Sequence, residues 1–185
     1  MMIKVLHAGT VTLMTAVSVV ALLVPGPAGT ASAGVLDVTC TPPSSQNDTY
    51  TPPLTLTPQD VTVRSATQYG PCVSASNPAI TSGSRSRTLL IPGRSCLDLL
   101  NSGSTTFTIT WNTGQSSTVS SNFTSTTVGA TLVVTDTGTV TSGLFTGSTV
   151  VQVLTAPAAD VLLCTAGLAT VSTIHSLMTL EITSL

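Results

Sequence analysis

Residues 104–143 read STTFTITWNTGQSSTVSSNFTSTTVGATLVVTDTGTVTSG. From Phe107 to Trp111, apolar side chains alternate with Thr, which is the period-two pattern of a strand with one buried face. Turn signals follow at residues 112–114 and at Gly129, where glycine suits a tight hairpin. The pattern therefore predicts three antiparallel strands that share one apolar face. The side chains on that face are Phe107, Ile109, Trp111, Val119, Phe123, Leu132, Val134 and Val140.

The first hairpin also sets the register of these strands. A three-residue loop at 112–114 places Phe107 opposite Val119. On the next pair of strands the same face puts Asp136 opposite Phe123. An unpaired carboxylate among apolar side chains would be costly, so we expect an arginine or a set of N–H and hydroxyl donors around Asp136, or a position at the rim of the sheet.

The rest of the chain repeats the same alternation, with turn signals roughly every ten residues. About eight or nine strands of this kind are typical of an all-β, antiparallel β-sandwich of Greek-key type. Residues 73–95 are rich in Ser, Asn, Pro, Gly and Arg, and we expect a loop between two cysteines there, with Leu89-Leu90-Ile91 as a candidate short strand. Residues 158–168 are compatible with a helical turn or a crossing loop. Further strands are predicted at residues 35–40, 50–57, 61–69, 149–155 and 173–182.

Residues 1–33 have the features of a signal peptide. Lys4 gives a basic start, an apolar run covers residues 11–24, and Ala31-Ser32-Ala33 provides a small-residue cleavage site. The run is too short to span a bilayer, and no later segment is long and apolar enough. We therefore expect residues 34–185 to be a single β-sandwich domain that is secreted, extracellular and without a membrane span.

The charge of the mature chain excludes one class of partner. Loss of Lys4 leaves four arginines against seven acidic residues, a net charge of −3. A nucleic-acid-binding surface needs many cations on one face, so we expect no nucleic-acid partner. The remaining residues are rich in Ser and Thr, which suits strands with hydroxyl-covered outer faces.

All four cysteines lie in the mature part, and an even number in an exported protein indicates disulfide bonds. We predict the pairs Cys40–Cys72 and Cys96–Cys164. The first would join neighbouring strands, and the second would fasten the ends of the central strands. The alternative, Cys72–Cys96 with Cys40–Cys164, would close residues 73–95 at their base. No C-x-x-C spacing occurs, so we expect neither a metal site nor a cofactor.

Three short strings carry a resemblance to known proteins: Tyr69-Gly70-Pro71-Cys72, TWNTGQ at residues 110–115 and TGTVTSGLF at residues 137–145. Through them the mature chain resembles a group of small secreted actinobacterial proteins of unknown function. The resemblance implies a bacterial, secreted, β-rich domain with two disulfides. It implies no activity and no catalytic residues.

The inventory of reactive groups argues against an enzyme. Asp136-Thr137-Gly138 matches the motif of aspartic proteases, but those enzymes need two such aspartates and the chain has one copy. Any Ser-His-Asp triad in the mature chain would have to use His175, and no G-x-S-x-G elbow is present. A glycosidase needs a pair of carboxylates, and nothing in the sequence selects one. We therefore predict a protein with no catalytic residues.

Binding is the class of function that the sequence favours. Trp111 continues the apolar register and is expected in the core, which leaves Tyr50 and Tyr69 as aromatic candidates for stacking on a sugar. Arg85, Arg87 and Arg94 form a candidate binding loop. We expect a non-enzymatic binding or structural module at or near the cell surface, with a cell-wall glycan as one candidate partner. The alternative is an inhibitor of a secreted trypsin-like protease that acts through the arginine loop.

Overall fold

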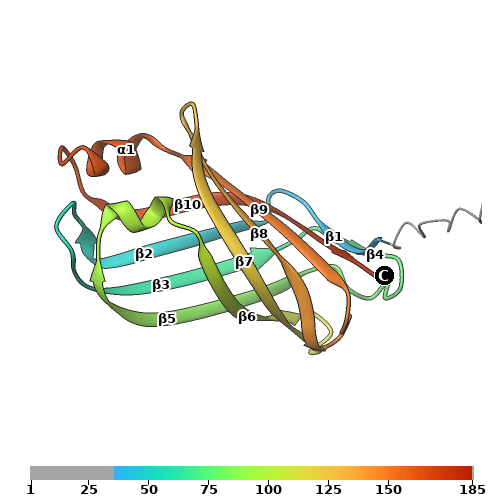
Figure 1. The fold of residues 1–185 in the computed structure, drawn as a ribbon. Coiled ribbons are helices and arrows are strands. Elements are labelled where there is room, and N and C mark those ends of the chain that lie inside the picture. The colour runs from blue at the N-terminus through green and yellow to red at the C-terminus, as the bar shows by residue number, and fades with distance from the viewer. Residues whose placement is uncertain (1–35, 185) are drawn as a thin grey trace, which may run out of the picture. The chain divides into compact units, whose positions relative to one another are not determined.

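The computed structural model describes residues 36–184, and the predicted signal peptide lies outside them. Most of these residues lie in strands, and the remainder include one 3-10 helix and one short α-helix (Figure 1). The predicted all-β class is therefore confirmed. The elements are β1 (Leu36–Cys40), β2 (Ser45–Leu54), β3 (Gln59–Tyr69), β4 (Cys72–Ser74), β5 (Gly83–Arg94), η1 (Cys96–Leu100), β6 (Gly103–Trp111), β7 (Ser116–Val128), β8 (Thr131–Gly143), β9 (Thr149–Pro157), α1 (Ala159–Thr165) and β10 (Val171–Thr183).

The strands close into an eight-stranded antiparallel barrel, so the predicted Greek-key sandwich is wrong. The order around the barrel is β2-β3-β5-β6-β7-β8-β9-β10, and pairing between β10 and β2 completes the ring. The alternation of apolar and polar residues shows that each strand has one buried face. Strands of a barrel and of a sandwich both have one buried face, so the alternation does not distinguish the two architectures. Strands of up to thirteen residues coil strongly enough for the last strand to meet the first.

Strands β1 and β4 extend the wall of the barrel at one end. Residues 171–177 of β10 pair with β2, and residues 180–183 pair with β1. β1 in turn pairs with β4, where Cys40 lies opposite Cys72. The pair β1 and β4 therefore continues the pair β2 and β3 beyond a break in each strand.

The central strands have the predicted register. Phe107 lies opposite Val119, and Phe123 lies opposite Asp136. Trp111 is 2% exposed, as the alternation predicted. Its ring meets Phe145 edge-on at a centroid distance of 6.0 Å, and its Nε1 donates to Ser117 Oγ at 2.9 Å.

The barrel interior holds two separate apolar clusters. The first contains Trp111 and lies toward β1 and β4, while the second contains Leu54 and lies toward η1 and α1. Between them the inward positions carry polar side chains, and this layer holds the candidate site. The main members of the first cluster are Val38, Tyr69, Ile80, Phe107, Ile109, Trp111, Val119, Met178, Leu180 and Ile182; those of the second are Tyr50, Leu54, Val61, Leu99, Leu132, Ala156, Val161, Val171 and Ile174.

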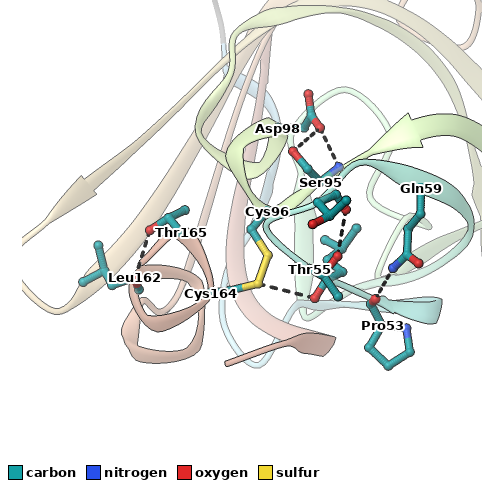
Figure 2. The surroundings of a disulfide bond; sticks show 11 residues. Pro53, Thr55, Gln59, Ser95, Cys96, Asp98, Leu162, Cys164 and Thr165 are labelled. Carbon is teal, nitrogen blue, oxygen red and sulfur yellow. Dashed lines mark hydrogen bonds between the residues drawn. A yellow bond between two sulfur atoms is a disulfide. The ribbon is translucent and has the colours of Figure 1, made fainter. Parts of the chain in front are cut away.

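Both predicted disulfides, Cys40–Cys72 and Cys96–Cys164, are confirmed. The second joins the first residue of η1 to α1, as Figure 2 shows. Asp98 holds the start of η1 by accepting hydrogen bonds from the Ser95 amide at 2.7 Å and the Ser95 hydroxyl at 3.0 Å. This end of the barrel is therefore covered by two short helices that are bonded covalently to each other.

The loop predicted at residues 73–95 is wrong over most of its length. Residues 72–74 form β4, and the twelve residues of β5 pair with β3 from Tyr69 opposite Gly83 onward. The prediction failed because the first inward positions of β5 are Gly83, Arg85 and Arg87, and apolar side chains follow only at Leu89 and Ile91, where the sequence indicates a short strand. Pro92 and Gly93 form an irregularity in β5, a place where proline is tolerated in a sheet.

Candidate functional site

A cavity of about 560 Å³ lies inside the barrel between the two apolar clusters. All eight barrel strands contribute to its wall, and η1 adds Asp98 and Leu99. One part of the wall is apolar, and another carries arginine, aspartate and hydroxyl groups. The apolar members include Tyr50, Val63, Ile91, Phe107, Phe123, Leu132, Val134, Leu154 and Ile174.

The cavity opens between β5 and β6. These strands pair only at Gly83 with Trp111 and at Ser84 with Thr110, and beyond those positions they separate (Figure 1). Where β5 and β6 separate, residues from both faces of each strand line the cavity. Ser86 of β5 and Thr106 of β6 point outward, and they line it together with inward residues of the same strands. A cavity that reaches both faces of a strand reaches its edge. We call this opening between β5 and β6 the seam.

Arg85 is held in a fixed position on the cavity wall. Its partner across the ladder is the buried Thr67, which places the side chain inside the barrel. The guanidinium donates from Nε to Thr67 Oγ1 at 3.1 Å and from Nη2 to Gln46 Oε1 at 2.8 Å. Its Cζ also lies 4.0 Å from the centroid of the Phe107 ring, a favourable cation–π contact.

Arg87 and Arg94 line the same cavity, but fewer contacts within the protein hold their side chains in place. Arg87 lies two residues beyond Arg85 on the same face of β5, and its side chain is exposed at the seam. Arg94 ends β5 and is half-buried, and its Nε is buried without a hydrogen-bond partner in the described part of the chain. Among residues 36–184, neither side chain donates a hydrogen bond to a carboxylate. The site therefore holds guanidinium donors that the protein leaves unused.

The carboxylates of the cavity, by contrast, are bound by the protein. Asp136 is 5% exposed and accepts a hydrogen bond from Gln152 Nε2 at 2.9 Å, while Tyr69 donates to the Oε1 of the same glutamine at 3.0 Å. Burial raises the pKa of Asp136, and the charge of Arg85 opposes that rise. Burial also raises the pKa of Tyr69, to about 12, so its hydroxyl stays protonated at neutral pH.

The geometry gives no support to the catalytic motifs. Thr137 and Gly138 lie within β8, where Gly138 packs directly on the backbone of Ser120, so Asp136 is not on an exposed loop as a protease aspartate is. His175 is exposed on β10, with its side chain outside the barrel. In residues 36–184, no three His, Cys, Asp or Glu side chains gather in a way that could hold a metal ion.

The structure brings the three predicted arginines together on one wall, although it places them on a strand instead of a loop. Tyr50 also lines the cavity, and Tyr69 lies just beyond it. The sequence reasoning missed Gln46 and Gln152. Gln152 lies at an inward position of β9, between Val150 and Leu154. A polar residue at an inward position of an apolar strand could have indicated a polar site inside the protein.

No protein family, curated protein or solved structure matches this chain. The resemblance to small secreted actinobacterial proteins therefore stays a prediction. Residues 36–184 contain no helix with the length and apolar character needed to cross a membrane.

Proposed function

We propose that the protein is a secreted, non-enzymatic binding module that encloses a small, partly apolar molecule inside its barrel. The observation that carries the proposal is the cavity of about 560 Å³ between the two apolar clusters. Its volume lies within the roughly 300 to 1,000 Å³ typical of small-molecule sites, and its wall combines apolar surface with a few placed polar groups. Two disulfides and the predicted signal peptide are compatible with an extracellular location.

A binding role fits the bonding of the polar groups better than a catalytic role does. Asp136 is bonded to an amide, Gln152, and Tyr69 completes that chain. An activated nucleophile is hydrogen-bonded to a base that takes its proton. The described residues of the cavity hold no such pair, and their bonds instead fix the shape of the wall.

The structure supports the protease-inhibitor alternative less well than it supports a binding role. An inhibitory segment must be presented on an accessible loop, but residues 83–94 form a strand that pairs with β3. Arg85 lies inside the barrel. A cell-wall glycan as a partner of the outer surface stays a prediction.

The test is binding of a neutral fluorescent probe, N-phenyl-1-naphthylamine, to the mature protein with both disulfides formed. We expect saturable binding of the probe, and we expect a single substitution on the cavity wall to block it. Ser65→Phe places a ring inside the cavity, since Ser65 lines it, and should abolish binding. Ala66→Phe is the matched control, because the next residue of β3 is exposed on the outer face. Equal binding by both variants, or no binding by the unmodified protein, would refute the proposal.

A further inference from the structure

We infer that the bound molecule is an amphipathic organic acid, with its anionic group held at the seam by Arg85 and Arg87, which lie two residues apart on one face of β5, and its apolar body inside the barrel. The inference rests on the proposed function and adds the chemical class of the ligand. It follows from the placement of the arginines, from the state of the neighbouring carboxylates and from the apolar wall opposite them.

Three of the four arginines in the described chain line this one cavity, and all three come from β5. The fourth, Arg64, is exposed on the outer face of β3. Arginine is the residue best suited to bind carboxylate and phosphate groups through paired N–H donors. A concentration of guanidinium groups inside a barrel therefore indicates an anionic ligand.

The donors of these arginines are only partly used. Arg85 bonds to uncharged acceptors, Thr67 Oγ1 and Gln46 Oε1, which orient the group without neutralising it. Arg94 Nε is buried and unpaired in the described part of the chain. The cavity wall therefore carries guanidinium donors that no acceptor of residues 36–184 uses.

Among residues 36–184, the nearby carboxylates form no hydrogen bond with the arginines of the cavity. Asp48 accepts from Gln46 Nε2 at 2.8 Å, and Asp98 accepts from the Ser95 amide and from Asn101 Nδ2 at 3.1 Å. Asp136 is bonded to Gln152, and its burial favours the uncharged form. The acceptors of the site are thus bonded within the protein, while the positively charged donors face the cavity.

The remaining wall suits an apolar body. Phe123 and Val134 lie on β7 and β8, with Leu154 on β9 and Ile174 on β10, so these side chains are on strands away from β5. Arg87 is exposed at the opening, whereas Leu154 is 5% exposed. A ligand that enters through the seam would leave its charged group at the arginines and bury its chain against these side chains.

The experiment compares two competitors of the neutral probe, decanoate and its uncharged analogue methyl decanoate. We expect decanoate to displace the probe from the unmodified protein at a concentration at least about ten-fold lower than the ester, since a charged hydrogen bond contributes that much or more. Arg87→Met should reduce this preference by about ten-fold. Arg64→Met is the matched control and should leave the preference unchanged.

Arg87→Met is the informative variant, because its side chain is exposed and its loss should leave the fold intact, as circular dichroism would verify. If the probe binds but the two competitors act equally, or if Arg87→Met keeps the preference for decanoate, the inference is wrong and the proposed function stands. If the probe does not bind to the unmodified protein, both are wrong.

Discussion

Replacement of Ser117 by alanine should destabilise the barrel by about 2 to 3 kcal/mol. Ser117 Oγ accepts a hydrogen bond from Trp111 Nε1 at 2.9 Å and donates one to the Leu144 carbonyl at 2.6 Å. Ser117→Ala leaves the indole N–H unpaired in a site where Trp111 is 2% exposed, at a cost of about 1 to 3 kcal/mol. The Leu144 carbonyl is only partly buried and can turn to water, so it adds less.

The effect of Ser117→Ala on stability can be measured by fluorescence, because Trp111 is the only tryptophan of the chain. Urea unfolding followed by Trp111 emission gives the free energy of unfolding of each variant. Ser116→Ala is the matched control, because that neighbouring hydroxyl is exposed on the opposite face of β7. A Ser117→Ala protein that unfolds within about 0.5 kcal/mol of the Ser116→Ala protein would show that the hydrogen bonds to Trp111 and Leu144 do not hold this end of the core.

Three further predictions concern other parts of the barrel. The pKa of Asp136 is raised in the folded state, so its contribution to stability should decline as the pH rises above about 3.8, and Asp136→Asn should flatten that decline in unfolding curves measured from acidic to neutral pH. Removal of the Cys96–Cys164 bond with alanine at both positions should lower the free energy of unfolding by at most about 4 kcal/mol, the loop-entropy value for its 68-residue separation, and unchanged urea unfolding would contradict this. Gly138→Ala should cost about 1 to 3 kcal/mol or prevent folding, because a Cβ there would meet the Ser120 carbonyl, and a thermal unfolding temperature equal to that of the unmodified protein would argue against so close a contact.

The central strands could be predicted from sequence because their signals are local. Alternation from Phe107 to Trp111 and a turn of known length fix which residues face each other, and the observed pairs agree. Closure of the barrel depends instead on β2 and β10, which lie far apart in the chain. β2 carries Gln46 and Asp48 at inward positions, so its sequence lacks the apolar alternation that reveals a buried face.

Residues of the site could be predicted from the sequence, but their position inside the barrel could not. Arg85 and Arg87 were recognised as candidate binding residues because most of the arginine of the chain is concentrated there. Their spacing of two residues is that of one strand face, yet charged residues at such positions usually indicate a solvent-facing surface. In a barrel with a polar layer inside, charged residues can instead face the interior. Only the long-range pairing of β5 with β3 shows which face of β5 points into the barrel.

The seam has a consequence for the behaviour of the protein in concentrated solution. A fully closed barrel has no free edge, but here the facing edges of β5 and β6 lack a ladder partner beyond the Ser84–Thr110 pair. Free edges can recruit a strand from another molecule and so begin aggregation. Two features of β5 oppose this: the charge of Arg87 at the opening, and the irregularity at Pro92, which interrupts a straight edge. The charge of Arg87 at the seam would therefore oppose pairing of this free strand edge with a strand of another molecule.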